Sequence, residues 1–261
     1  CYEDVEKIKF YTKKYQQTIR CHIKIDTGLN RMGCKASEFK FIYSEICKIE
    51  LILLEGVYSH LSSSPDLNAA SNCLQFNCFK KAINFIQDPN IKLHFLNSGG
   101  ILNFKNNIYD AVRPGIIIYG ISPIENNKNL KPVMEFKAPV VLIKNIFKGE
   151  SIGYDSAYTA SKNMTIAIVQ CGYADGLNKN FEKKGVVFYK NKEFEILGKI
   201  SMDLFAVNCS NYKLKINDEL TIWGGENCKS KLEHISSIHK SIPYIYLTSL
   251  SRRVKREYIE K

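Results

Sequence analysis

The chain has 261 residues, of which 45% are hydrophobic and 24% are charged. This composition excludes a disordered chain and leaves room for two domains. The formal net charge is +11, but the basic residues are mostly lysines spread along the sequence, which favours a solvated surface over a nucleic-acid-binding patch. The longest apolar run, near residues 115 to 123, is too short to cross a bilayer. We therefore expect neither nucleic acid nor membrane as a partner.

The first 120 residues alternate between helix-like and strand-like patterns. Helices are predicted at residues 4–17, 37–49 and 68–88, and a short one begins at residue 97. The first helix carries Val5, Ile8, Tyr11 and Tyr15 on one face, and the second has Ser37 as its N-cap. Strands are predicted at residues 21–26, 51–60 and 92–98, and another begins near residue 111. Repeated strand and helix units imply a parallel sheet, open or closed into a barrel.

The pattern changes after residue 121. The second half is rich in β patterns separated by Gly and Asn turns, with a hairpin predicted at YKNKEF, residues 189–194. A short helix near residues 230–239 and a final strand are predicted to close it. We therefore predict a partial α/β barrel at residues 1–120 and a β-rich domain at residues 121–261. A complete eight-stranded barrel needs about 250 residues, and the chain starts at Cys1 rather than Met, so we expect the first half of the barrel to be encoded ahead of it.

Cysteine and histidine usage argues against disulfides and metals. Nine cysteines are present, an odd number with no CxxC, and several lie in apolar segments: Cys21, Cys47 and Cys171. They are expected to be reduced, buried thiols of a cytoplasmic protein. The five histidines lack metal-ligand spacing, so no metal is predicted.

Polar side chains follow the predicted strands of the first half, where each strand meets its loop. They are Lys24, Asp26, Asn30 and Arg31, then Tyr58, Ser59 and His60, then Asn97 and Ser98, and finally Arg113 with the amides of Gly115 and Ile116. Because the carboxyl ends of parallel strands form one rim, these groups together indicate an active site. Each also has a plainer interpretation, such as a surface ion pair, a core histidine or an ordinary turn.

Ser98 and the amides of Gly115 and Ile116 offer neutral donors suited to a phosphate. Neither GxxxxGK[ST] nor GxGxxG is present, which disfavours a nucleotide. A phosphorylated organic cofactor fits this rim better.

Eight motifs in order carry a family resemblance: KIDTGLNRMG, LEGVYSH, LNSGG, VRPGIIIYG, GESIGYDSAYT, GYADG, GKISMD and SRRVKR. The sequence resembles bacterial alanine racemases over nearly its whole length. The resemblance implies a TIM barrel followed by a β domain, pyridoxal 5'-phosphate (PLP) as cofactor and a homodimer. It also implies interconversion of L- and D-alanine, an isomerase reaction that supplies D-alanine for peptidoglycan.

The resemblance also implies residue roles around the cofactor ring. Arg113 matches the arginine that hydrogen-bonds the pyridine nitrogen, and His60 matches the histidine between that arginine and the catalytic tyrosine. Tyr154 matches this tyrosine, which exchanges a proton at the substrate Cα from the partner subunit.

Further matches concern the phosphate and the substrate. Cofactor-binding positions near the phosphate are matched by Asn97, Ser98, Gly115, Ile116 and Tyr244. Arg31 matches the arginine near the substrate carboxylate, and Lys24 matches a lysine that some members carbamylate. Met202 and Tyr173 match entrance positions that reach across the dimer, and their alternative is plain packing in the β domain.

The sequence departs from the family pattern in several places. The lysine that binds PLP covalently has no match, because the early lysines lie in a helix-like segment. Racemisation needs a lysine base on one face of the substrate Cα and a tyrosine base on the other. We therefore expect this chain to hold the tyrosine but not the lysine. Asp155 stands where glycine usually follows the tyrosine, and its carboxylate is expected to disfavour ionisation of Tyr154. Ile245 and Lys255 replace an acidic residue and a proline.

Three alternatives remain beside alanine racemisation. The first is a racemase of another amino acid, such as serine, on the same architecture. The second is an inactive truncated remnant that lacks the PLP lysine. The third, a PLP-binding protein with a single barrel, is disfavoured because it has no counterpart of residues 121–261. A half barrel would leave unpaired strand edges, so we expect the isolated chain to aggregate or to be partly disordered.

Overall fold

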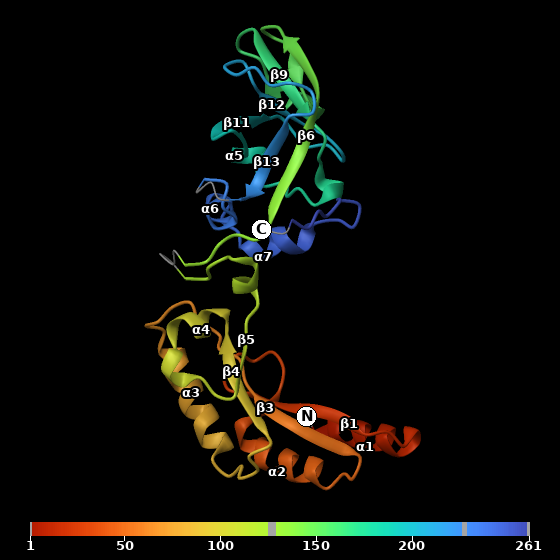
Figure 1. Ribbon diagram of the computed structural model, residues 1–261, viewed down its shortest axis with the longest axis vertical. Coiled ribbons are helices and arrows are strands. Elements are labelled where there is room, and N and C mark those ends of the chain that lie inside the picture. Colours follow the sequence, from red (N-terminus) through yellow and green to blue (C-terminus); the bar gives the residue numbers. More distant parts are fainter. Residues whose placement is uncertain (1, 125–128, 226–228, 260–261) are drawn as a thin grey trace. The chain divides into compact units, whose positions relative to one another are not determined.

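The computed structural model describes residues 2–124, 129–225 and 229–259. The chain divides into two compact units (Figure 1). The first comprises Cys1–Ile118 and Ser122–Asn127, and the second comprises Tyr119–Ile121 and Lys128–Lys261.

The first unit is built on a parallel sheet. Its strands are β1 (Ile19–Asp26), β2 (Cys34–Lys35), β3 (Ile52–Tyr58), β4 (Lys92–Asn97) and β5 (Ala111–Arg113). They are ordered β2-β1-β3-β4-β5, and all neighbouring pairs are parallel. The order β1-β3-β4-β5 follows the chain, as in a barrel wall. The predicted α/β part of the fold is therefore confirmed.

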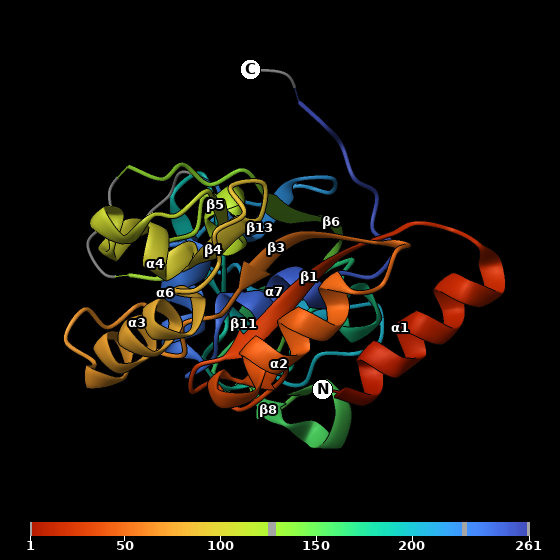
Figure 2. The ribbon, with the colours of Figure 1, turned by 90° about the horizontal axis from the view of Figure 1, so that it is seen from below.

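One face of this sheet is covered by helices. They are α1 (Tyr2–Tyr15), α2 (Ala36–Cys47), α3 (Ala70–Ile83) and the short α4 (Ser98–Asn103), with 3-10 turns at Lys105–Asn107 and Ile116–Tyr119. Figure 2 shows α2 and α3 next to each other, and they are in contact. Buried residues of α2, α3 and the strands form one apolar core, which includes Phe39, Ile42, Phe79, Ile25 and Phe95. Fully burying a side chain of this kind contributes about 1.5–3 kcal/mol.

The other face of the sheet carries polar side chains. On β1, Ile23 and Ile25 are buried in the core, so the alternate residues His22 and Lys24 point to the opposite face. Gly56 of β3 pairs with His22 across the sheet. This polar face leads to the strand ends where the candidate site lies.

Two helix predictions in this unit are wrong in detail. α2 has Lys35 as its N-cap, and the Glu38 carboxylate accepts from the Lys35 amide at 3.1 Å, so Ser37 is not the cap. In α1, Val5 is buried as expected, but Tyr11 and Tyr15 are 49% and 57% exposed and stack on each other. Tyrosine rings have a polar hydroxyl and tolerate solvent. Their place on the apolar face of the predicted helix therefore did not mean that they are buried.

The cysteines also differ from the prediction. Cys171 is buried, and burial raises the pKa of its thiol above the usual range. Cys21 is half-buried, whereas Cys47 is exposed at the last turn of α2. The prediction of burial for Cys47 is therefore wrong, because its position on the helix faces away from the sheet.

The second unit is a closed β barrel. Its strands are β6 (Glu135–Ile146), β9 (Met164–Val169), β10 (Val186–Tyr189), β11 (Lys192–Leu197), β12 (Phe205–Asn208) and β13 (Glu219–Gly224). The order is β10-β11-β12-β9-β6-β13, with antiparallel pairs throughout and β13 pairing back to β10. Closure removes the free edges that an open sheet presents. The predicted β-rich part of the fold is confirmed.

Two further strands of this unit are short, β7 (Ser151–Ile152) and β8 (Tyr158–Thr159), and they pair antiparallel. The predicted hairpin joins β10 and β11. Its turn residues, Lys190 and Asn191, have φ of 47° and 64°. Two successive positive φ values are typical of the tight turns that match strand twist.

The last regular element in the described part of the chain is a helix, so the predicted final strand is wrong. α5 (Phe181–Lys184) and α6 (Leu232–Ile238) precede α7 (Pro243–Ser249), which begins with a proline. Proline favours the first helical position because it has no amide hydrogen to leave unpaired there. Tyr246 of α7 is 1% exposed, and its hydroxyl lies 2.8 Å from Nδ1 of His239. No helix in the described ranges is long and apolar enough to cross a membrane.

Candidate active site

Arg113 lies at the end of β5, and its guanidinium is surrounded by acceptors. Nη2 donates to the carbonyl oxygens of Ser59 and Phe95, the latter at 3.2 Å, and Nη1 donates to Nδ1 of His94. The guanidinium carbon also lies 4.9 Å from the centre of the Tyr58 ring. These contacts compensate the half-buried charge, which would otherwise be costly. No residue in the described part of the chain accepts from the two remaining donors, Nε–H and the second N–H of Nη1.

His60 lies beside Arg113 and is held neutral. Burial, followed by the positive charges of Arg113, Arg31 and Lys24, lowers the pKa of His60 to about 4. Nδ1 of His60 lies 3.4 Å from Nη2 of Arg113. At neutral pH the ring therefore has one bare nitrogen and one N–H group.

Asn97 determines which nitrogen of His60 is bare. Oδ1 of Asn97 accepts from the Gly100 amide at 3.1 Å and from the Ser64 hydroxyl at 2.6 Å. Nδ2 then faces the Leu61 carbonyl oxygen at 3.3 Å and Nε2 of His60 at 3.2 Å. Since an amide NH2 group only donates, Nε2 of His60 accepts and the ring proton lies on Nδ1. The approach of Arg113 to Nδ1 is consequently a contact between two donors.

Ser98 and Gly115 are joined by a hydrogen bond across two strand ends. The Gly115 amide donates to Oγ of Ser98 at 2.8 Å, and the Ser98 side chain is buried. Ile116, which is 2% exposed, begins the 3-10 turn that follows. The hydroxyl and the two amides predicted to meet a phosphate thus lie in one place.

Lys24 and Arg31 bring two positive charges together at the end of β1. Burial, followed by the charge of Arg31, lowers the pKa of Lys24. The loop between them is shaped by Asp26, whose Oδ1 accepts from the amides of Gly28 at 2.9 Å and Asn30 at 3.1 Å. Burial raises the pKa of Asp26, but these backbone hydrogen bonds outweigh it and lower the pKa overall.

Tyr154 belongs to the second unit, where it stands on the turn between β7 and β8. Its side chain is 67% exposed. The neighbouring Asp155 has φ of 55°, a left-handed conformation that explains why glycine suits this position and why aspartate is tolerated. The Asp155 carboxylate pairs with the ammonium of Lys199, which lowers the pKa of Asp155. The ammonium of Lys199 therefore lies beside the carboxylate that was expected to disfavour ionisation of Tyr154.

Tyr173 and Met202 lie on two turns of the second unit that are bonded to each other. The Tyr173 amide donates to the Ser201 carbonyl oxygen and the Ala174 amide to that of Met202, both at 3.1 Å. Gly172 permits this approach, because a Cβ there would lie 2.1 Å from the Met202 oxygen. Tyr173 and Met202 are 42% and 53% exposed, so neither side chain packs into the barrel.

Sequence reasoning assigned no role to the residue that fixes these turns. Arg253, in the closing SRRVKR segment, donates to Asp175 at 2.7 Å and to Asp203 at 2.6 Å.

Tyr244, in the first turn of α7, is 47% exposed, and burial of its phenol raises its pKa.

His22 and His94 were also missed. Nδ1 of His22 lies 2.8 Å from Nε2 of His94, which in turn meets Arg113. The period of two along β1, His22-x-Lys24-x-Asp26, was a usable signal, because it places His22 on the same face as the candidate residues.

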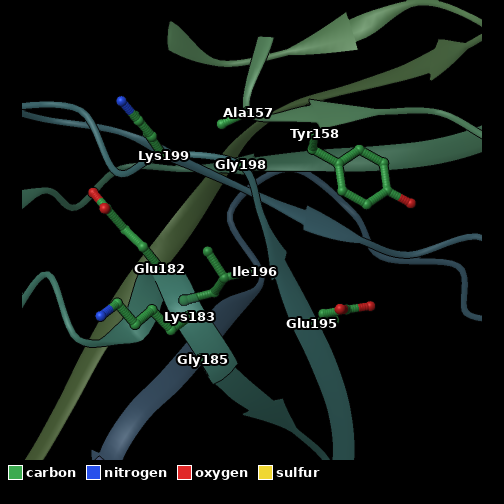
Figure 3. Close-up of a pocket in the computed structure, with 9 residues that line it drawn as sticks. All are labelled: Ala157, Tyr158, Glu182, Lys183, Gly185, Glu195, Ile196, Gly198 and Lys199. Atoms are coloured by element: carbon green, nitrogen blue, oxygen red, sulfur yellow. The ribbon is translucent and has the colours of Figure 1, made fainter. Parts of the chain in front are cut away.

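A separate pocket of about 310 Å³ lies in the second unit (Figure 3). Its lining includes Tyr158, Glu182, Lys183, Glu195 and Lys199. None of the predicted site residues lines it, so the site is defined by the side-chain network and not by this pocket.

Comparison with known proteins adds to this geometry. Residues 1–123 match the sequence profile of the alanine racemase N-terminal domain, and residues 133–258 match that of the alanine racemase C-terminal domain. The alanine racemase of Vesicomyosocius okutanii is 35% identical over 240 residues, which cover 92% of this chain and 67% of that protein. That of Rickettsia akari is 33% identical over 255 residues, which cover 97% of this chain and 69% of that protein.

Solved structures agree. The alanine racemase of Streptomyces coelicolor A3(2) superposes with a TM-score of 0.91 at 26% identity, covering 99% of this chain and 71% of that one. The alanine racemase of Bartonella henselae, solved with covalently bound pyridoxal phosphate, gives a TM-score of 0.87 at 30% identity with the same coverage. This chain thus spans about two thirds of the length of these proteins and belongs to the alanine racemase family.

Proposed function

We propose that this protein is a PLP-dependent alanine racemase that interconverts L- and D-alanine in the cytoplasm and supplies D-alanine for peptidoglycan. The observation that carries the proposal is the environment of Arg113. Within the described residues, the protein engages three of the five N–H donors, one on Nη1 and two on Nη2, and leaves Nε–H and the second Nη1–H for a ligand. The cytoplasmic assignment is supported by the odd number of cysteines and the lack of a CxxC pair.

The residues of the first unit fit the cofactor's two polar ends. Arg113 offers a donor to the ring nitrogen. Ser98 and Gly115 are joined by a hydrogen bond next to Ile116, and we propose that these three residues bind the phosphate, with the Ser98 hydroxyl as a donor. Asn97 supports both ends, because it binds His60 and caps α4, which begins at Ser98. We include Tyr244 of the second unit among the phosphate-binding residues.

Arg113 determines how strongly the ring withdraws electrons. When bound, PLP supplies the electron sink that acidifies the Cα hydrogen of alanine. A guanidinium donates and never accepts, so Arg113 keeps the ring nitrogen unprotonated and the sink weak. A weak sink disfavours side reactions such as transamination. His60, held neutral beside Arg113, adds no second positive charge.

Tyr154 moves the proton at Cα on one face of the substrate. Its exposed position on the β7–β8 turn suits a side chain that enters the site of a partner subunit. We therefore propose a homodimer in which Tyr154 and Met202 act across the interface and Tyr173 lies with Met202 at the substrate entrance. The paired turns that carry Tyr173 and Met202 support a common role.

Arg31 binds the substrate carboxylate, and Lys24 positions Arg31. The lowered pKa of Lys24 increases the fraction of neutral amine, which is the form that reacts with carbon dioxide. The amine nitrogen attacks the carbon of carbon dioxide, a proton is released, and an anionic carbamate remains. This carbamate would turn the repulsion between Lys24 and Arg31 into an ion pair.

The proposal is tested in the full-length protein with PLP, by following racemisation of L-alanine with a chiral assay. Replacing Arg113 with Glu should lower kcat about 100-fold, because a carboxylate cannot make the guanidinium's contacts with His94, Ser59 and Phe95, so the group that aligns the cofactor ring is lost. Arg113→Lys, which keeps the charge but loses the fork, should fall between this variant and the wild type. Arg20→Lys is the matched control, since Arg20 is an exposed arginine on the same sheet that pairs with Glu55. Wild-type turnover by Arg113→Glu would refute the role of Arg113.

A further inference from the structure

We propose that His22 is a positioning residue that fixes the tautomer of His94 and thereby the orientation of the Arg113 guanidinium. The inference rests on the proposed function, because it concerns the residue that meets the cofactor ring. Its basis is a continuous chain of contacts: Nδ1 of His22 lies 2.8 Å from Nε2 of His94, and Nδ1 of His94 accepts from Nη1 of Arg113.

The direction of each hydrogen bond follows from the chemistry of arginine. A guanidinium has five N–H donors and no acceptor, so Nδ1 of His94 must be bare. The His94 proton then lies on Nε2, which leaves Nδ1 of His22 to accept it. Burial, followed by the charge of Arg113, lowers the pKa of His94 to about 4, consistent with a neutral ring. The chain of donors therefore runs from Arg113 through His94 to His22.

The packing around His22 leaves space for this geometry. A Cβ at Gly56, its partner on β3, would lie 2.5 Å from Nδ1 of His22, so any other residue there would displace the ring. The His94 ring is stacked on Tyr58 with centroids 4.9 Å apart and planes 8° apart. The same Tyr58 ring lies under the guanidinium of Arg113. Both histidine rings thus have a defined place beside the group that they orient.

A hydrogen-bond acceptor at position 22 keeps the proton of His94 on Nε2, so that Nδ1 of His94 can accept from Arg113. A donor in that place would face the Nε2–H group of His94 and favour the other tautomer of the ring. The proton of His94 would then lie on Nδ1, directed at Nη1 of Arg113, where two donors cannot bond. The guanidinium would have to rotate, and the direction of its Nε–H group would change.

The first test is independent of catalysis. In the full-length protein with PLP and 15N-labelled histidine, NMR should show a scalar coupling across the hydrogen bond between Nε2 of His94 and Nδ1 of His22. Both Nδ1 atoms should be unprotonated. A proton on Nδ1 of His94 or of His22 would overturn the proposal. If this coupling is present while the protein does not racemise alanine, the proposed function fails and the hydrogen-bond chain stands.

The second test uses three variants of His22 in the same protein. His22→Asn keeps an acceptor at the Nδ1 position, His22→Leu removes it, and His22→Lys replaces it with a donor. His22→Lys should lower kcat about tenfold through misorientation of Arg113 and move the His94 proton to Nδ1. His22→Leu should have a smaller effect, and His22→Asn should restore both the tautomer and kcat.

The control is His234→Leu, which removes an exposed histidine from α6 and should change neither the His94 tautomer nor kcat. If His22→Lys keeps the wild-type tautomer and kcat, His22 does not position Arg113. If His22→Asn is as impaired as His22→Leu, ring packing and not hydrogen bonding explains the role of His22, and the proposal is overturned.

Discussion

The two units place their candidate site residues in different surroundings. In the first unit, Arg113, His60 and Asn97 lie at the ends of parallel strands and contact one another. In the second, Tyr154, Tyr173 and Met202 stand exposed on turns outside a closed barrel. The contacts within the first unit indicate what its side chains can bind. The exposed side chains of the second unit depend for their role on the surface that they contact. The first unit therefore carries the argument for cofactor binding, and the second carries the argument for a partner.

The largest difference between the two units is expected in a measurement of unfolding free energy, because each unit has its own core. Phe79 of α3 is fully buried and stacks on Phe95 with centroids 4.9 Å apart. Phe79→Ala should lower the free energy of unfolding of the first unit by about 3–5 kcal/mol through loss of burial and a residual cavity. Phe10→Ala, at a 60% exposed position of α1, should change it by less than about 0.5 kcal/mol.

The single tryptophan separates the two units in this experiment. Trp223 lies on β13 and is 2% exposed, so its fluorescence reports on the second unit. In urea, the circular dichroism transition of Phe79→Ala should move to lower concentration while the fluorescence transition stays. If both transitions move together, the two cores do not behave as separate units.

The pH dependence of stability should also differ between the units. Burial, followed by the charge of Arg113, lowers the pKa values of His60 and His94 from 6.5 to about 4. Between about pH 6.5 and pH 4 the unfolded chain binds protons that the folded chain does not, so the free energy of unfolding of the first unit falls as the pH falls. Burial lowers the pKa of His239 in the second unit, which contributes with the same sign but through one imidazole.

Denaturation at a series of pH values checks this expectation. The circular dichroism transition should lose more stability than the Trp223 fluorescence transition over this window. His94→Asn should reduce the difference, because one of the two shifted groups is removed. A first unit whose stability is constant from pH 6.5 to pH 4 would show that these imidazoles are not held neutral.

The smallest effect is expected at the exposed turn of the second unit. The pair between Asp155 and Lys199 is solvent-exposed, with side chains 77% and 44% accessible, and such pairs contribute little. Asp155→Gly removes the pair but also places a glycine at a left-handed position. In the full-length protein kcat should change by less than about twofold, with Lys199→Gln as the matched variant. A large loss in both variants would show that the ion pair holds Tyr154 in place.

The sequence predicted most of the architecture because its signals are local. The polar residues at the ends of the predicted strands identified Lys24, His60 and Arg113 as candidates. The turn at Lys190 and Asn191 was likewise encoded in a short segment. These features depend on neighbours within one element, which the sequence displays directly.

The remainder depended on contacts between distant segments. The bonds of His94 to both His22 and Arg113 require the register of four strands, and a single strand pattern does not contain it. The segment YIYLTS is rich in aromatic and β-branched residues, which favour strands, yet it forms α7, because Pro243 and burial of Tyr246 favour a helix. The pairing of Asp155 with Lys199 joins residues 44 positions apart.

The central claim is that Arg113 donates a hydrogen bond to the ring nitrogen of PLP and keeps it unprotonated. The most direct measurement is the 15N NMR signal of this nitrogen in the full-length protein loaded with 15N-labelled PLP. The account predicts a bare nitrogen with no attached proton at neutral pH, and a gain of that proton in Arg113→Glu. A protonated ring nitrogen in the wild-type protein would contradict it.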